Sequence, residues 1–384
     1  MMTRKMLGSL CLLVLCGILV AGLWPFHAPK NEVRWLSPGP GLFFGKYGSI
    51  VSAAAFDPKS QRADNSCSLE IWLEPTRVQS SGTILAFYQP NSRVTPFSLR
   101  QSLGDLVIQR APQEKGKRAE LLKAYIEGVF TPQRPVFVTI RAGKSGMTVY
   151  ADGVFVKRVS SLGLSSQDLT GQLIVGTSPV TADGWSGRLK GLAIYNGELT
   201  EDDVSENFAN WGNRARPDLA KSAGAVALYI FNQGIGNVVH NQLDSTTDLL
   251  IPDQFFILQE QFLERPWDEF RPDLNYWKDV GINVAGFIPL GFFFYAYLSL
   301  VRSSGRSAAI AIALGFAVSL TIELLQSFLP TRNSGMTDLI TNTMGTAIGV
   351  MVFRHPSVQA VMAATGLIAA QTIQATSAFS PLDS

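Results

Sequence analysis

The stretch Ser319-Leu-Thr-Ile-Glu323-Leu-Leu-Gln326 places a carboxylate inside an apolar segment, and Asp338-Leu-Ile-Thr-Asn342 begins the next apolar segment. A carboxylate in a membrane-spanning helix costs roughly 2.5–3.5 kcal/mol at the bilayer centre and less near the helix ends. Such residues usually face a partner helix or a water-filled cavity. The two segments are therefore predicted to be membrane helices with a polar site between them.

The spacing of these polar residues places them on shared helix faces. Glu323 and Gln326 are three residues apart, and Asp338 and Asn342 are four apart. The short loop between the segments makes them antiparallel neighbours, and Arg332 in that loop is the expected counter-charge for Glu323 or Asp338. The candidate intramembrane site comprises Asn283, Glu323, Gln326, Arg332, Asp338 and Asn342. A purely structural lock between helices is the alternative interpretation.

Apolar segments lie at both ends of the chain. A helix needs about 20 consecutive apolar residues to cross a bilayer. The predicted spans are residues 6–26, 281–301, 307–327 and 338–353. A further segment, 358–375, either spans the membrane or lies at its surface, and the sequence does not favour one over the other. The first segment exceeds the apolar core of a signal peptide, usually about 7–15 residues, so a retained helix is favoured over a cleaved one.

Basic residues set the expected orientation, because short cytoplasmic loops are enriched in Lys and Arg. They precede the first span and follow the second and fourth: Arg4, Lys5, Arg302, Arg306 and Arg354. We expect a multi-pass protein of a bacterial inner membrane, with the lipid bilayer as its partner. Its N-terminus is expected in the cytoplasm and its middle part outside the cytoplasm.

The composition combines a membrane protein with a soluble one. Of the 384 residues 46% are hydrophobic, and the apolar excess is concentrated before residue 27 and after residue 280. A net charge of +2, without a basic cluster, argues against a nucleic-acid partner. Three scattered histidines and three cysteines form no zinc motif, and we expect no cofactor. Calcium in the middle part has no supporting motif, and Cys67 has no partner there for a disulfide.

Residues 43–245 show the alternation typical of β-strands. Leu69, Ile71 and Leu73 share one strand face, and Asp152-Gly153 lies between two strand patterns, which predicts a hairpin with a type I′ turn. Many short strands separated by turns predict an all-β jelly-roll sandwich. A capping-box pattern at 200–203 predicts a short helix that ends at Ala209. The fold class expected for the whole chain is this sandwich joined to an α-helical transmembrane bundle.

Three motifs of this middle part resemble a concanavalin A-like module of the laminin G type. They are the strand at 68–75, the hairpin around Asp152-Gly153, and the strand at 187–195 followed by Leu199-Thr-Glu-Asp-Asp203. The resemblance implies a jelly roll, and many such modules bind carbohydrate. The segment 227–236 departs from the pattern, because it resembles a strand that often opens these modules and here closes one.

Some members of that superfamily hydrolyse glycosidic bonds with two carboxylates about 5–10 Å apart. Catalytic members carry these carboxylates on one strand, in a Glu-x-Asp-x-x-Glu pattern. Glu70 and Glu74 share a strand face here, but Trp72 stands where the aspartate would be. We expect these three side chains on a solvated outer face, and we expect the domain to be a binding or spacer module.

The apolar C-terminal part resembles the VanZ family, which is named for a protein giving low-level teicoplanin resistance. The resemblance rests on 283–291, 319–332 and 338–345 and covers residues 270–354. It implies a VanZ-like module at 280–354, whose first helix lies within 1–42. The β-module at 43–245 then looks like an insertion, 246–279 is a linker, and 355–384 holds the further segment and tail. Gly335 departs from the family, in which many members carry an acidic residue there.

The resemblances imply a cell-envelope factor for glycopeptide tolerance or an envelope polysaccharide, with a glycan or a glycopeptide as ligand. A membrane enzyme acting on lipid-linked glycans and a purely structural scaffold are the alternatives. An enzyme is less favoured, because Ser319, Ser327 and Thr341 lack a nearby histidine and no HExxH motif is present. An acid–base pair of Glu323 and Asp338 keeps that alternative open.

Overall fold

The computed structural model describes residues 4–57, 65–90, 94–112, 121–143, 146–214, 224–260, 262–270 and 272–364. The chain forms two compact units. A helical unit contains residues 1–27 and 260–384, and a β unit contains residues 28–259. The β unit is therefore inserted in the sequence between the first helix and the remaining helices.

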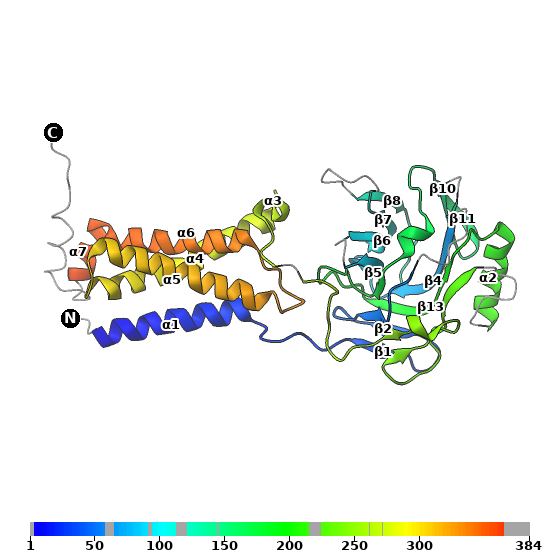
Figure 1. The fold of residues 1–384 in the computed structure, drawn as a ribbon, viewed down its shortest axis with the longest axis horizontal. Coiled ribbons are helices and arrows are strands. Elements are labelled where there is room, and N and C mark those ends of the chain that lie inside the picture. Colours follow the sequence, from blue (N-terminus) through cyan, green and yellow to red (C-terminus); the bar gives the residue numbers. More distant parts are fainter. Residues whose placement is uncertain are drawn as a thin grey trace. The chain divides into compact units, whose positions relative to one another are not determined.

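The β unit is a sandwich of two antiparallel sheets (Figure 1). The first sheet has the order β1 (Val33–Trp35), β2 (Leu42–Phe44), β13 (Gly187–Tyr195), β4 (Cys67–Pro75), β9 (Val136–Gly143), β10 (Gly146–Ala151) and β11 (Val154–Val159), with β14 (Ala225–Tyr229) also paired to β13. The second sheet has the order β15 (Val238–Val239), β16 (Leu249–Leu250), β3 (Ile50–Ser52), β12 (Gln172–Val175), β5 (Ser81–Gln89), β6 (Val94–Ser102), β7 (Asp105–Arg110) and β8 (Leu122–Ile126). Strands outside the expected range 43–245, namely β1 and β16, belong to these sheets.

The core between the sheets forms because alternate side chains of each strand point inward. Leu69, Ile71 and Leu73 are fully buried there, as their alternation predicts. Cys67 is buried in the same core with a free thiol. At the β10–β11 hairpin, Asp152 and Gly153 have φ of 50° and 75°, which a type I′ turn requires. The predicted hairpin is confirmed.

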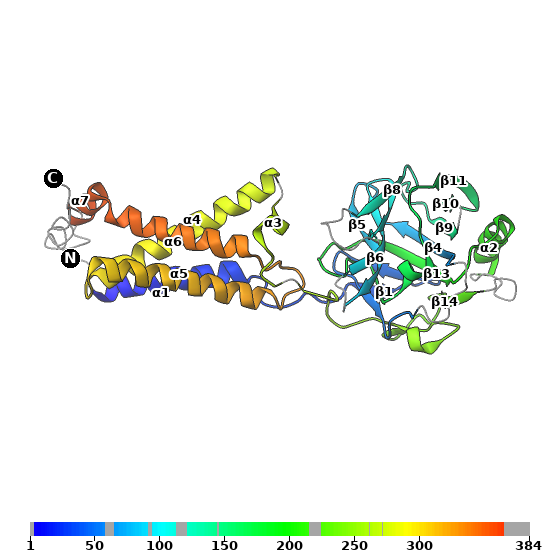
Figure 2. The same cartoon turned by 45° about the horizontal axis from the view of Figure 1, so that its top comes forward.

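Helix α2 (Glu201–Arg214) covers part of the outer face of the first sheet (Figure 2). It begins as the capping pattern predicts: the Asp203 amide donates to Thr200 Oγ1 at 3.1 Å, and the Thr200 amide donates to the Asp203 carboxylate at 2.8 Å. The helix continues beyond Ala209, because Trp211 packs against the sheet beside Phe137. Two short 3₁₀ helices, Ser166–Leu169 and Ser245–Thr247, lie in connections.

The helical unit contains α1 (Arg4–Leu23), α3 (Pro266–Glu269), α4 (Leu274–Ser299), α5 (Ser304–Gln326), α6 (Met336–Arg354) and α7 (Pro356–Ala364). Among the described residues, α1, α4 and α5 are long and apolar enough to cross a membrane. Helix α6, the expected fourth span, falls outside that set because threonines, Asp338 and Asn342 interrupt its apolar residues. Of the segment 358–375, only the part within α7 lies in the described residues.

Close backbone contact joins α4 to α6. A Cβ added at Gly345 would lie 2.2 Å from the Val284 carbonyl oxygen, and one at Gly349 would lie 2.1 Å from that of Ile288. These glycines form the GxxxG pattern that allows helices to approach closely. The prediction of an all-β jelly-roll sandwich joined to a bundle of apolar helices is confirmed.

Candidate functional site

Glu323 lies in the last turn of α5, and its side chain is almost completely buried. Its Oε2 accepts a hydrogen bond from the Gly335 amide at 2.8 Å, and the Ser334 side chain also hydrogen-bonds the carboxylate. Gly335 is the residue that caps α6, so the carboxylate sits at the positive end of that helix. Glu323 therefore fixes the connection between α5 and α6.

Three other predicted residues join different helix pairs. Asn283 Nδ2 on α4 donates to Asp338 Oδ1 on α6 at 2.7 Å. Asn342 Nδ2 on α6 donates to the hydroxyl of Ser319 on α5 at 3.0 Å. Gln326 Nε2 at the end of α5 donates to a carbonyl oxygen of α1 at 2.7 Å. Together these bonds connect α4 to α6, α6 to α5 and α5 to α1.

Arg332 does not pair with either predicted carboxylate. Its guanidinium donates to the Trp24 carbonyl, just beyond the end of α1. No ion pair within 4 Å joins it to Glu323 or Asp338, all three of which the structure describes, so the predicted counter-charge acts on Asp338 only through space and not by direct contact. The physical reason is that the free carbonyls after a helix end are strong acceptors for a guanidinium, and the Gly335 amide already holds Glu323.

Glu269 of α3 is a functional candidate that the sequence analysis missed. Its Oε2 accepts from the Thr337 amide at 3.0 Å and also from the Thr337 hydroxyl, so it binds the first turn of α6. A Cβ at Gly335 would lie 1.6 Å from Glu269 Oε1. The carboxylate of Glu269 thus occupies the space beside Gly335. The departure at Gly335 was the available signal, but it could not identify Glu269.

Glu269, Glu323 and Asp338 bring three carboxylates to one end of the helical unit. Backbone pairing of Glu264 with Ser334 and Met336 holds the segment before α3 against the α5–α6 connection. Within the described part of the chain, no group of three His, Cys, Asp or Glu residues is arranged to hold a metal ion. The arrangement can anchor helix ends and accept hydrogen bonds.

In the β unit, Glu70 is fully buried beneath α2, so the expected solvated position is wrong. Its carboxylate accepts hydrogen bonds from Tyr195 Oη at 2.8 Å, Asn207 Nδ2 at 2.9 Å and Trp211 Nε1 at 3.4 Å. Burial raises the pKa of Glu70 to about 7, although these hydrogen bonds act in the opposite direction. Glu74 is also largely buried and pairs with Arg188 at 2.9 Å.

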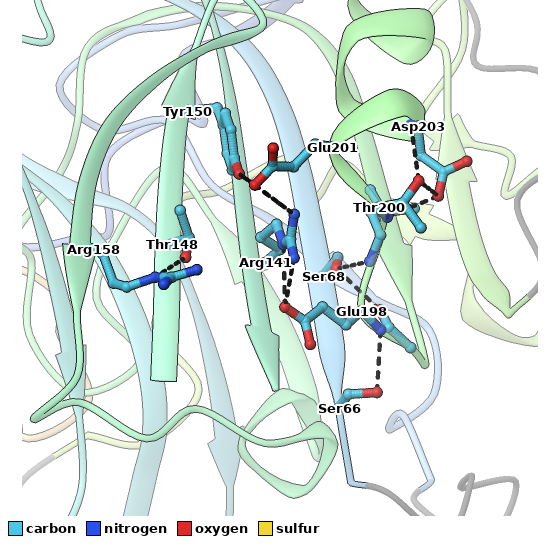
Figure 3. Close-up of polar contacts among 12 residues, drawn as sticks. Ser66, Ser68, Arg141, Thr148, Tyr150, Arg158, Glu198, Thr200, Glu201 and Asp203 are labelled. Atoms are coloured by element: carbon cyan, nitrogen blue, oxygen red, sulfur yellow. Dashed lines mark hydrogen bonds and ion pairs between the residues drawn. The ribbon is translucent and has the colours of Figure 1, made fainter. Parts of the chain in front are cut away.

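A second polar cluster joins the same face of the first sheet to the start of α2 (Figure 3). Arg141 of β9 donates to Glu198 Oε1 at 3.0 Å, and Tyr150 of β10 donates to Glu201 at 3.3 Å. Ser68 of β4 accepts from the Leu199 amide at 3.0 Å. These contacts position the loop before α2. Because each of these polar groups already has a partner within the protein, we interpret the cluster as structural.

Comparison with known proteins identifies both parts. Residues 48–205 match the concanavalin A-like lectin/glucanases superfamily, and residues 222–359 match the VanZ/LLP1 family. The chain joins a concanavalin A-like domain to a VanZ-like domain. The VanZ/LLP1 match begins before the helical unit, in the part of the chain that forms the last strands of the sandwich. The chain has no match among curated proteins.

Solved structures that resemble the chain include a putative carbohydrate binding protein from Bacteroides ovatus, with 12% identity, 57% of this chain and 61% of that chain covered, and a TM-score of 0.39. A SAP-like pentraxin from Limulus polyphemus has 15% identity, coverage of 60% and 95%, and a TM-score of 0.32. A botulinum neurotoxin serotype D ligand binding domain in complex with N-acetylneuraminic acid has 13% identity, coverage of 47% and 45%, and a TM-score of 0.34. The chain covers less than two thirds of the first and third of these.

The VanZ-like domain makes this a membrane protein. Its family is membrane-associated, and α1, α4 and α5 have the length and composition of membrane spans. The predicted pairing of a VanZ-like domain with a concanavalin A-like domain in one chain is confirmed.

Proposed function

We propose that this protein is a cell-envelope factor that holds a carbohydrate-binding domain at the outer surface of the membrane. The observation that supports this is the insertion of the concanavalin A-like domain between α1 and α4 of the helical unit. The hydrogen bonds from Gln326 to α1 and from Asn283 to Asp338 place the end of α1 and the start of α4 at the same end of that unit. The chain therefore leaves and re-enters the membrane on one side.

Exposed aromatic side chains support a membrane boundary at this end. Trp24, Trp267 and Trp277 are 63%, 60% and 56% exposed in the protein, and each adjoins the start or end of a helix there. Tryptophan is enriched at the level of lipid head groups, where its ring is apolar and its N–H can bond to water. We propose that these residues lie in the outer interface of the bilayer.

Within this function, we propose that the predicted intramembrane residues act as a lock between helices. Three side-chain amides each donate a hydrogen bond to a neighbouring helix: those of Asn283, Gln326 and Asn342. In an apolar environment such bonds contribute roughly 1 kcal/mol each. The VanZ-like domain is then the anchor, and the concanavalin A-like domain carries the recognition.

Binding of envelope polysaccharides tests the proposal. The full chain, purified in detergent micelles, should bind saccharides on an array that displays bacterial cell-wall and capsular glycans. A second preparation, with the β unit unfolded by heat, is the control for adsorption to the micelle. Equal signals from the two preparations, or no bound saccharide at all, would show that the domain is not a carbohydrate-binding module.

A further inference from the structure

A pocket opens on the β unit between the β8–β9 connection and the β10–β11 hairpin. Its volume is about 320 Å³, at the lower end of the roughly 300–1,000 Å³ that is typical of ligand pockets. Polar side chains and two valines of β11 line it: Glu127, Thr131, Arg134, Asp152, Val154 and Val156. A pocket of this size accommodates a ring-sized group.

An ion pair forms the polar wall of this pocket. Arg134 Nη2 donates to Asp152 Oδ2 at 2.9 Å, while Asp152 Oδ1 accepts from the Phe137 amide at 2.9 Å. The carboxylate is thus fixed by the backbone of β9. The guanidinium, with a side chain that is 68% exposed, keeps further N–H groups for a ligand.

The backbone holds the pocket in shape before any ligand arrives. Asp152 has the φ of 50° that the first central residue of the β10–β11 type I′ turn requires, and the Phe137 amide holds its carboxylate. Gln133, next to Arg134 in the β8–β9 connection, has a φ of 56°. The hairpin turn and the Gln133 conformation both fix the backbone of the segments that line the pocket.

The chemistry of the wall selects the ligand. A sugar hydroxyl both donates and accepts hydrogen bonds, and here carboxylate acceptors stand beside guanidinium donors. The lining holds one cation, Arg134, and two carboxylates, those of Glu127 and Asp152, so it carries no excess positive charge, which disfavours an anionic ligand. Val154 and Val156 offer an apolar surface to the C–H face of a ring.

From these observations we infer that the pocket binds a neutral pyranose ring of an envelope glycan. The inference rests on the proposed function and assigns its ligand to Arg134, Asp152 and the valines of β11. The guanidinium and the carboxylate bind ring hydroxyls, and the valines exclude water from the opposite face. Other units of the glycan extend into solvent.

Three variants of the full chain in detergent micelles test the assignment by isothermal titration. The probes are neutral oligosaccharides of glucose, mannose and N-acetylglucosamine, and an oligosaccharide of glucuronic acid. Arg134→Gln removes the donor group, and Val154→Trp fills the pocket from a position that is 68% exposed and tolerant of size. Arg158→Gln is the matched control, since Arg158 is an exposed arginine of β11 outside the pocket lining.

At least a tenfold rise in Kd for Arg134→Gln and Val154→Trp, with Arg158→Gln unchanged, is the expected result. Unchanged affinity in all three variants would overturn the pocket assignment and leave carbohydrate binding intact. Binding of the glucuronic acid probe alone would overturn the neutral ligand and again spare the proposed function. Failure of the wild-type chain to bind any probe, together with a blank glycan array, would overturn both.

Discussion

Glu70 illustrates at the residue scale how burial converts a surface-like sequence position into a structural one. Its carboxylate receives three hydrogen bonds from neutral donors, Tyr195, Asn207 and Trp211. Among the described residues, no lysine or arginine forms an ion pair with it, so burial dominates and its pKa lies at about 7. The folded β unit therefore binds a proton more readily at this site than the unfolded chain, whose ordinary carboxyl pKa is 4.5.

The stability of the β unit should depend on this proton. A raised pKa contributes stability that is fully present below pH 4.5 and is lost as the pH rises through about 7. Relative to Glu70→Gln, the wild-type free energy of unfolding should fall by roughly 2–3 kcal/mol between pH 5 and pH 8. Urea unfolding of residues 28–259 at both pH values measures this difference.

Glu74→Gln is the control, because Glu74 has a cation partner in Arg188 and lies on the same strand. Its pH profile should follow the wild type. A Glu70→Gln profile parallel to the wild type would show that Glu70 does not titrate in this range.

At the scale of elements, the contact between α4 and α6 organises the helical unit. Gly345 and Gly349 let the α6 backbone approach the carbonyls of Val284 and Ile288, and this closeness allows Asn283 to reach Asp338. Small residues are the usual means of such packing in membranes, where lipid offers no hydrophobic drive for association. Van der Waals contact and a few hydrogen bonds must hold the helices.

Gly345→Ala should separate α4 from α6. The added Cβ would lie 2.2 Å from a backbone oxygen, which cannot move without displacing the helix. We expect a loss of about 1–3 kcal/mol, the usual cost of overpacking. Gly281→Ala is the matched control, because nothing lies within 4 Å of its added Cβ. Thermal unfolding of the full chain in detergent distinguishes them, and equal transition temperatures would contradict this packing.

Patterns within one element were sufficient to predict that element. The alternation of Leu69, Ile71 and Leu73 predicted the inward face of β4. The Asp152-Gly153 pair predicted the hairpin of β10 and β11. The same patterns could not show that α2 covers Glu70, because alternation identifies the side facing the core and not what lies over the other side. Nor could they assign Glu269 to the space beside Gly335, since 65 intervening residues separate the two along the chain.

At the scale of the whole molecule, the two ends of the helical unit differ in chemistry. One end carries tryptophans and the carboxylates of Glu269, Glu323 and Asp338, together with the cations Arg265, Lys278 and Arg332. The other carries basic residues at the start of α1, between α4 and α5, in the first turn of α5 and at the end of α6: Arg4, Lys5, Arg302, Arg306 and Arg354. The guanidinium of Arg4 lies 5.7 Å from the ring centroid of Tyr297, which shows that the start of α1 and the end of α4 meet.

This asymmetry predicts the orientation in the membrane. Lysine and arginine in short loops are retained in the cytoplasm, so the α4–α5 turn should lie inside and the inserted β unit outside. A reporter enzyme that is active only outside the cytoplasm should be active when fused after Asn210 and silent when fused after Gly305. Replacing both Arg302 and Arg306 by glutamine should raise the activity of the reporter fused after Gly305, because those charges hold the turn inside. An active reporter at Gly305 and a silent one at Asn210 would reverse the orientation and remove the concanavalin A-like domain from the envelope surface.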